Sequence, residues 1–268
     1  MRIFHNNEAK QLNILDERFY QSNKDSDKYY PSVTTILEVF PKGYGYDEWL
    51  RSVGFNSSEI LRKAGEQGSN IHAMIDQYLS GATIKWMNED ESMKYTLIEW
   101  QMFSRFVEFW TKWKPETYVH EFSLVSDNLG FGGTIDFIGK IGKHIYLIDW
   151  KSSNALYKTH ELQIAAYAQM WQEINPKHKI DKTAILWLNA GTRGEDKAGK
   201  KIQGQGWQLK DDFGRSWEDA YKVFEHVFAV WKEENENFKP RNLIYPTEFS
   251  LDNKITLKDL LKDESKKD

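Results

Sequence analysis

The chain has 268 residues, a formal net charge of −4 and no cysteine. The absence of cysteine excludes disulfides, thiolate zinc sites, iron–sulfur clusters and cysteine nucleophiles. The negative net charge argues against a general nucleic-acid-binding protein, so any contact with nucleic acid has to use a local basic surface. The sequence contains no run of about 18 apolar residues, the length needed to span a membrane. The polar N-terminus lacks the apolar segment of a signal peptide. We therefore expect a cytoplasmic protein with no membrane partner.

The N-terminal segment predicts two short strands and a capped helix. The strands are expected at residues 11–14 and 18–20. Ser32 precedes a helical pattern over residues 33–40, where its hydroxyl can cap the first turn, and Pro41 ends that pattern.

The next segment predicts several helices. Residues 49–63 favour one or two helices with a break near Gly54. Two further glycines precede Ser69, which is a good N-cap for a separate helix over residues 70–79. His72 lies beside the apolar stripe of that helix, a position that is typical of a core histidine.

Residues 93–113 predict a long amphipathic helix, and residues 118–126 predict a strand. The helical stripe favours core packing over base stacking, and its members are Leu97, Trp100, Phe103, Val107, Trp110 and Trp113. Alternation along the strand places four side chains on one face: Val119, Glu121, Ser123 and Val125.

Residues 132–153 predict a β-hairpin with strands at 134–139 and 144–149. With an even-numbered loop, Asp136 is expected opposite position 147 and therefore on the same face as Asp149. Lys151 follows two residues after Asp149 and shares that face.

Two carboxylates and an ammonium group thus converge at the end of an apolar strand. Carboxylate oxygens are hard ligands that suit Mg²⁺, and a bound cation lowers the pKa of water and neutralises phosphoryl charge. The neighbouring lysine can stabilise developing negative charge. The arrangement predicts metal-dependent phosphodiester hydrolysis. The alternative is a solvated strand end, because acid-x-Lys is a weak pattern that also occurs at Asp252–Lys254.

The residues after the hairpin add further polar groups. Ser152 and Ser153 can contact a phosphate or the water shell of a metal. In a helix expected over residues 158–174, Gln163 and Tyr167 are four positions apart and share one face. They can hold a DNA backbone or brace the Lys151 strand, and a polar pair on the helix surface is the alternative.

The C-terminal part predicts a buried strand over 181–190, a strand over 207–209 and a helix over 216–238. Residues 191–206 form an extended hairpin or mobile loop in this interpretation. The default interpretation of this segment is a solvated loop. It nevertheless carries the best local basic cluster for contacts with phosphates: Arg193, Lys197, Lys200 and Lys201.

Five short motifs occur in a specific order. They are PSVT at 31–34, Gly68-x-x-x-His72, Gly133-x-x-Asp136, Asp149-x-Lys151 and Gln163-x-x-x-Tyr167. This series resembles the PD-(D/E)xK nuclease superfamily, and within it the RecB-like exonuclease branch of phage and mitochondrial type, without the iron–sulfur cysteines of some relatives.

The resemblance implies an α/β fold with a restriction-endonuclease-like core, in which helices flank a mixed central β-sheet. It implies a single nuclease domain over residues 1–268, with an N-terminal helical elaboration at about 30–115 and a charged C-terminal tail at about 252–268. The central sheet would contain the strands near 118–126, 132–139, 144–151, 181–190 and 206–209.

The resemblance also assigns roles within the site. His72, Asp136, Asp149 and the backbone carbonyl of Trp150 would hold one or two Mg²⁺ or Mn²⁺ ions, because imidazole accepts Mn²⁺ more readily than Mg²⁺. Glu121 lies where relatives often carry an auxiliary acid, although a surface glutamate is an equally fair interpretation. Lys151 would assist catalysis, and the DNA-positioning groups would be Ser152, Ser153, Gln163 and Tyr167.

The implied function is a metal-dependent exonuclease that hydrolyses linear DNA, single- or double-stranded, in phage-type recombination, replication or repair. A phage-encoded enzyme would act in the cytoplasm of a bacterial host. A single-strand-binding or annealing protein stays open as a partner. Three alternatives remain: a non-catalytic DNA-binding or assembly protein that retains the fold, a structure-specific endonuclease, and an interaction protein whose aromatic stripes form an oligomer interface.

Overall fold

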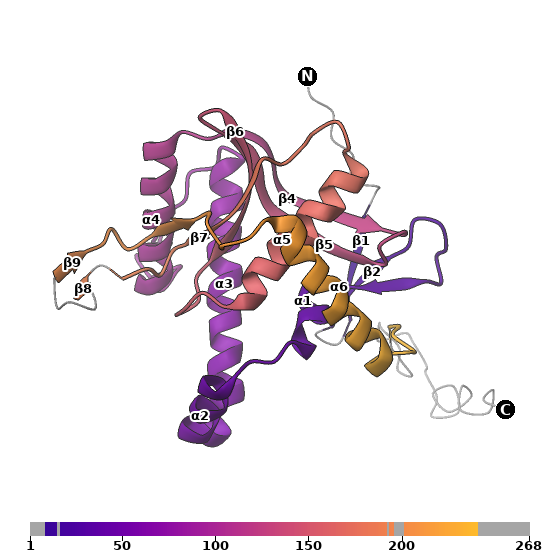
Figure 1. The fold of residues 1–268 in the computed structure, drawn as a ribbon. Coiled ribbons are helices and arrows are strands. Elements are labelled where there is room, and N and C mark those ends of the chain that lie inside the picture. Colours follow the sequence, from indigo (N-terminus) through magenta and orange to yellow (C-terminus); the bar gives the residue numbers. More distant parts are fainter. Residues whose placement is uncertain (1–8, 15–16, 192, 196–200, 241–268) are drawn as a thin grey trace, which may run out of the picture.

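A five-stranded mixed sheet forms the centre of the computed structural model, which describes residues 9–14, 17–191, 193–195 and 201–240 (Figure 1). The strand order is β10-β7-β6-β5-β4, and β6 runs parallel to β7 while the other neighbours are antiparallel. The strands are β4 (Glu116–Ser126), β5 (Phe131–Ile141), β6 (His144–Lys151), β7 (Lys182–Trp187) and β10 (Gln208–Lys210). The predicted mixed sheet is confirmed.

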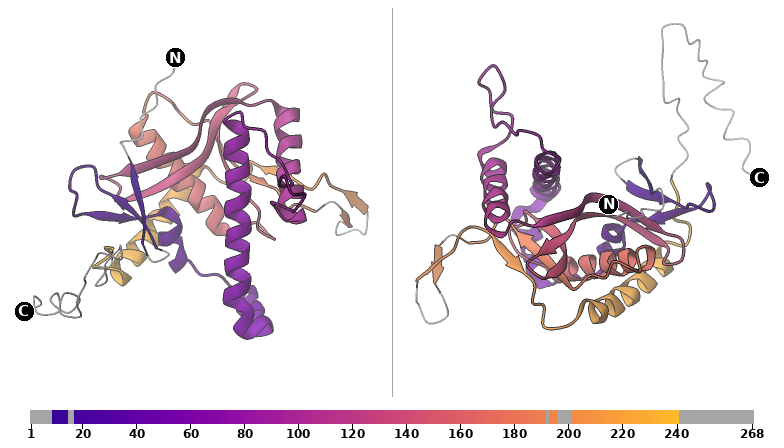
Figure 2. Two further views of the ribbon diagram at one scale, coloured as in Figure 1. Left: turned by 180° about the vertical axis from the view of Figure 1, so that it is seen from behind. Right: turned by 90° about the horizontal axis from the view of Figure 1, so that it is seen from above.

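Helices cover both faces of this sheet (Figure 2). On one face, α1 (Val33–Ile36), α5 (Lys158–Ile174) and α6 (Trp217–Glu234) share a core with the strands. On the other face, α3 (Ser57–Leu79) and α4 (Leu97–Trp113) form a second core. Helix α5 connects the parallel strands β6 and β7, as a parallel pair requires. Among the described residues, no helix is long and apolar enough to cross a lipid bilayer.

Smaller elements lie around this centre. A three-stranded sheet contains β1 (Lys10–Ile14), β2 (Glu17–Gln21) and β3 (Tyr29–Pro31), of which β3 was not predicted. A separate hairpin contains β8 (Arg193–Glu195) and β9 (Lys201–Gln203). The remaining helical segments are η1 (Leu37–Val39), α2 (Tyr44–Val53) and η2 (Gly54–Asn56). The tail expected at 252–268 lies outside the described residues.

Helix α3 is continuous, so the prediction of a separate helix capped by Ser69 is wrong. The Ser69 hydroxyl donates to the Gly65 carbonyl inside the helix (3.0 Å). The break occurs at Gly54, as predicted, where φ is +56°. Ion pairs of Arg62 with Glu59 and Glu66 connect successive turns in the part of α3 that precedes Ser69.

The predicted stripe of α4 is only partly buried. The apolar side chains that α4 buries are Met102, Phe103, Phe106 and Phe109, whereas Leu97 and Trp113 are exposed. Aromatic residues occur on several sides of this helix, so helical periodicity alone did not identify the side that packs against the sheet.

The β5–β6 hairpin has a tighter turn and a different register from the prediction. Its pairs run from Ile141↔His144 to Phe137↔Ile148. Only Gly142 and Lys143 form the turn, and Gly142 has a φ of +60°, which suits glycine. Leu147 pairs with Ile138, so the predicted position of Asp136 opposite residue 147 is wrong.

Strand β4 does not alternate regularly. Val119 and Phe122 both pack against the core that contains α5, whereas His120 and Glu121, between them, both contact α3. Glu121 has a φ of +43°, in the left-handed region that non-glycine residues seldom adopt. The expectation that Val119 and Glu121 share a face is therefore wrong.

The continuity of α3 can be tested with Gly65→Ala. A Cβ atom at position 65 would meet nothing within 4 Å, so we expect this variant to be more stable by about 0.5–1 kcal/mol, since alanine loses less backbone entropy in a helix. Urea denaturation followed by circular dichroism measures the change.

Gly43→Ala is the matched control for this substitution. Its Cβ would also meet nothing within 4 Å, but Gly43 has a φ of +79° and a ψ of 167°, a region that essentially only glycine adopts, so this variant should lose about 1–3 kcal/mol. Equal effects of the two substitutions would contradict a continuous α3.

Candidate metal centre

Three side chains from three different elements form a group that could hold a metal ion. His72 of α3, Glu121 of β4 and Asp136 of β5 place their ligand atoms within 4.8 Å of one another. His72 Nδ1 lies 3.3 Å from Asp136 Oδ1 and 3.5 Å from Glu121 Oε1. The structure thus brings Glu121, predicted only as an auxiliary group, into direct contact with the predicted histidine.

The backbone of Trp150 completes this group. Its N–H donates to Asp136 Oδ2 (2.7 Å), and its carbonyl oxygen lies 3.2 Å from His72 Nε2. The carboxylate of Asp136 therefore lies just beyond the last pair of β5 and β6, Phe137↔Ile148, and the Trp150 carbonyl contacts the ring nitrogen of His72 that does not face the two acids.

The negative charges of the two acids favour a positive charge within the group. Burial disfavours the imidazolium form of His72, but the carboxylates of Asp136 and Glu121 outweigh burial and raise the pKa of His72 well above its usual range. Burial likewise opposes ionisation of Asp136, yet His72, Lys151 and the Trp150 N–H outweigh it and lower the pKa of Asp136. A protonated imidazole thus supplies positive charge among the acids.

Two buried carboxylate oxygens also have no hydrogen-bond partner among the described residues. They are Glu121 Oε1 and Asp149 Oδ2. Burial raises the pKa of Glu121, and burial together with the charge of Asp136 raises the pKa of Asp149 to about 6, although Lys151 opposes the shift. The Glu121 oxygen is a ready ligand, so the group of His72, Glu121 and Asp136 fits Mg²⁺ or Mn²⁺. Asp149 does not belong to this group of three, and its Oδ2 faces the ammonium group of Lys151.

A second set of side chains lies on the α5 side of the sheet. Lys151 Nζ lies 2.6 Å from Asp149 Oδ2, although the angle is not that of a hydrogen bond. The same Nζ donates to Gln163 Oε1 (3.0 Å), and Gln163 Nε2 donates to the Tyr167 hydroxyl (3.0 Å). Gln163 and Tyr167 are buried, so they brace Lys151 and do not form a polar pair on the surface.

The packing of Tyr167, a member of this second set, requires glycine at position 133. A Cβ atom at position 133 would lie 2.4 Å from Cε1 of Tyr167, so only glycine lets the ring pack against β5. The glycine of one sequence motif and the tyrosine of another are therefore in direct contact.

The remaining predicted residues are placed as follows. Ser152 is half-buried beside α3, where a Cβ on Gly68 would lie 3.5 Å from its hydroxyl oxygen. The Ser153 hydroxyl donates to the Ala155 carbonyl (2.7 Å). Arg193 and Lys201 lie in β8 and β9. Lys197 and Lys200 lie outside the described residues.

His160 was not identified from the sequence. It lies in the first turn of α5, and its Nδ1 accepts from the Tyr157 N–H (3.3 Å). Burial, with the charge of Lys151, lowers the pKa of His160 to about 3, so the imidazole is neutral beside the site. No sequence motif marked it, because its relation to Lys151 arises only in the folded chain.

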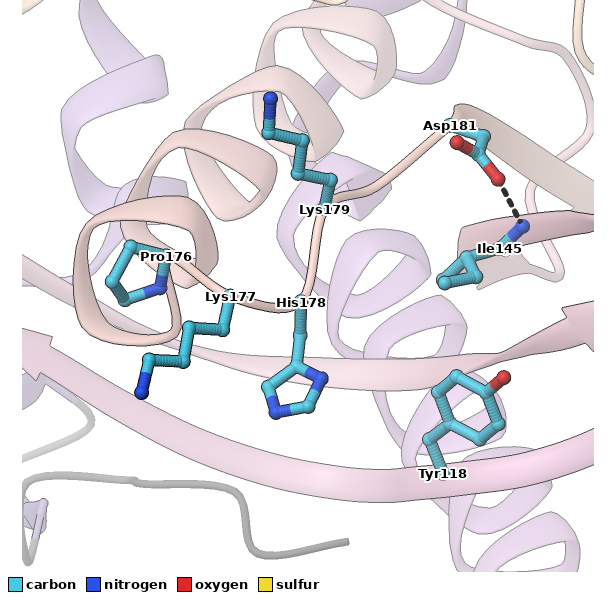
Figure 3. A pocket seen from close by; sticks show the side chains of 7 residues that line it. All are labelled: Tyr118, Ile145, Pro176, Lys177, His178, Lys179 and Asp181. Atoms are coloured by element: carbon cyan, nitrogen blue, oxygen red, sulfur yellow. Dashed lines mark hydrogen bonds between the residues drawn. The ribbon is translucent and has the colours of Figure 1, made fainter.

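A cavity of about 610 Å³ lies away from these groups (Figure 3). It is lined by Tyr118, Ile145, Pro176, Lys177, His178, Lys179 and Asp181. Asp181 Oδ2 accepts from the Ile145 N–H (2.8 Å) at its wall. Ile145 is six residues from Lys151 along β6, which corresponds to about 20 Å, so the cavity is separate from the candidate centre.

Comparisons with known proteins identify a family for the chain. Residues 44–241 match the family model of the PD-(D/E)XK nuclease superfamily. No curated protein matches the chain. One similar solved structure is that of a putative exonuclease from Eubacterium rectale, with 13% identity over 74% of this chain and 78% of that chain and a TM-score of 0.38, a likeness too low to carry an argument. Because the family match covers well over half of the chain and spans both sets of side chains, this chain belongs to the PD-(D/E)XK nuclease superfamily.

Proposed function

We propose that the protein is a divalent-metal-dependent deoxyribonuclease of the RecB-like branch, which acts as an exonuclease on linear DNA. Family membership supports nuclease chemistry. The observation that carries the proposal is the pairing of an acid group around His72 with a braced lysine, Lys151, on either side of the Trp150 backbone. The exonuclease specificity rests on the order of the sequence motifs.

His72, Glu121, Asp136, Asp149 and the Trp150 carbonyl would hold one or two Mg²⁺ or Mn²⁺ ions. When bound, such an ion lowers the pKa of a bound water molecule and neutralises charge on the phosphoryl group. The protein contributes prearranged ligands, because the Trp150 N–H already orients Asp136.

Lys151 would stabilise the negative charge that develops on the phosphoryl oxygens or orient the attacking water. An ammonium group has three N–H donors. One donates to Gln163, and the contact with Asp149 is an ion pair without hydrogen-bond geometry, so N–H groups stay available for the substrate. The contacts with Gln163 and Asp149 hold the ammonium group in place, which lowers the reorganisation needed during the reaction.

Phosphates outside the scissile bond would meet Ser152, Ser153 and the basic residues of the β8–β9 segment, Arg193, Lys197, Lys200 and Lys201. Gln163 and Tyr167 would act on DNA through Lys151, since both are buried. The proposal also treats residues 1–268 as one nuclease domain with a helical elaboration and places the activity in DNA recombination, replication or repair.

The catalytic assignment predicts that Asp149→Asn and Lys151→Met each lower Mg²⁺-dependent cleavage of linear DNA by roughly 10²–10³-fold, because a prearranged charge at the reacting phosphate is removed. A fluorescent end-labelled duplex gives the rates. Lys140→Met in β5, which changes a lysine outside the site, should cleave at the wild-type rate, and near-normal activity of Lys151→Met would disprove the role of Lys151.

The pKa values predict how metal binding depends on pH. Asp149 has a pKa of about 6, and ligands bind metal in the deprotonated form, so protonation of Asp149 below pH 6 should reduce the apparent Mn²⁺ affinity by about tenfold per pH unit, in addition to the reduction that protonation of His72 causes. The raised pKa of His72 predicts that Mn²⁺ binding still releases a proton at pH 7. Calorimetry in buffers of different ionisation enthalpy measures both effects, and an affinity that is constant from pH 5 to 7 would contradict this electrostatic description.

The exonuclease assignment predicts that linear duplex or single-stranded DNA is degraded to short products from its ends, while covalently closed circular DNA stays intact. Product sizes from 5′- and 3′-labelled substrates with Mg²⁺ or Mn²⁺ test this. Cleavage of closed circles at a comparable rate would instead identify a structure-specific endonuclease.

A further inference from the structure

The two strands that carry the acids of the centre are irregular at the same place. On β4, His120 and Glu121 both reach α3. On β5, Ile135 and Ile138 pack in the core with α5, whereas Asp136 contacts His72 and Phe137 packs in the core with α3 and α4. Each strand therefore turns two consecutive side chains toward one face, which regular alternation does not permit.

The two irregularities face each other in the ladder. His120 pairs with Phe137 and Phe122 pairs with Ile135, so Glu121 and Asp136 occupy the rung between these two pairs. The register on both sides of that rung is the same. The irregularity thus changes the direction of two carboxylates without shifting the strands.

Turning Glu121 in this way costs free energy. Its φ of +43° lies in the left-handed region, where a non-glycine residue is strained by about 1–3 kcal/mol and persists only if its surroundings hold it. The contact of Glu121 with His72, at 3.5 Å, does not supply a good hydrogen bond. Another contact has to hold this part of β4 against α3.

The adjacent residue provides such a contact. His120 Nδ1 lies 2.8 Å from Asp76 Oδ1, and Nδ1 donates because a carboxylate can only accept. Asp76 follows His72 by one turn on α3, so it lies on the same helix face. Two consecutive residues of β4 are therefore matched to two consecutive turns of α3: His120 to Asp76 and Glu121 to His72.

We propose that His120 and Asp76 are positioning residues for the metal centre, whose contact holds Glu121 toward His72. This inference rests on the proposed function, because it takes the group of His72, Glu121 and Asp136 as a metal site. His120 and Asp76 themselves do not touch the substrate or the metal. They fix the strained backbone that presents one ligand.

The test uses the full-length protein with Mn²⁺ as the probe. Asp76→Ala and His120→Ala, which each remove the His120–Asp76 hydrogen bond, should weaken Mn²⁺ binding in calorimetry by about 10–100-fold, the range found for groups that support metal ligands. The Mn²⁺ concentration needed for half-maximal DNA cleavage should rise in parallel, while the rate at saturating Mn²⁺ stays near wild type. His120→Gln, whose amide can still donate to Asp76, should restore part of the affinity.

Asp211→Ala is the matched control. It breaks the Lys182–Asp211 ion pair, which has a similar distance of 2.9 Å and similar exposure but lies at another part of the sheet. The Mn²⁺ requirement of this variant should not change. Melting temperatures of all variants separate loss of the fold from loss of positioning.

A double variant tests whether the effect of Asp76 on Mn²⁺ binding depends on Glu121. In a Glu121→Ala background, adding Asp76→Ala should cause no further loss of Mn²⁺ affinity, because the group to be positioned is gone. Equal losses in both backgrounds would overturn the inference, as would unchanged affinity in Asp76→Ala while the wild type binds Mn²⁺ and cleaves DNA. A wild type that binds no Mn²⁺ would overturn the proposed function itself.

Discussion

The backbone of Trp150 makes the contacts on which the centre depends. Its N–H holds Asp136, its carbonyl faces His72, and its two neighbours in sequence are Asp149 and Lys151. The indole is fully buried and packs against Phe106 and Phe137, with ring centroids 5.2 and 5.6 Å apart. Because the side chain is fixed in the core, the backbone that joins the two sets of polar groups is fixed as well.

Electrostatic balance explains why these acids can be buried together. Isolated carboxylates are costly to bury unless they are paired, protonated or bound to a metal. In the described structure, His72 carries positive charge among the acids, and Asp149 has a raised pKa of about 6 beside Lys151. The same charges make the site a good host for a divalent cation, since binding replaces protons with a stronger positive charge.

The aromatic residues mainly build the two cores. Trp150 and Trp171 are among the largest fully buried side chains, and the buried face of α4 contains Phe103, Phe106 and Phe109. These rings join the helices to the sheet on both faces and therefore set the distance of α3 and α5 from β6. Because these rings are buried, they are not available for base stacking or for an oligomer interface, which were the alternatives considered from the sequence.

Local patterns determined much of this protein. The helix expected over 158–174 is α5 to the residue, Ser32 caps α1 through the Thr35 N–H, and the apolar strand before Asp149 lies at the centre of the sheet. Periodicity, caps and turn residues act over a few positions, so they can be read from one chain. The order of the short motifs was sufficient to indicate the superfamily.

Tertiary structure alone decided which side chains meet. The continuity of α3 through Gly65 and Gly68, the buried face of α4 and the hairpin register all differ from the prediction. The left-handed conformation of Glu121 also could not be predicted, because regular alternation is the assumption on which strand prediction depends. The buried face of α4 and the conformation of Glu121 are set by contacts between residues far apart in the chain, and a strained backbone is stable only when such contacts hold it.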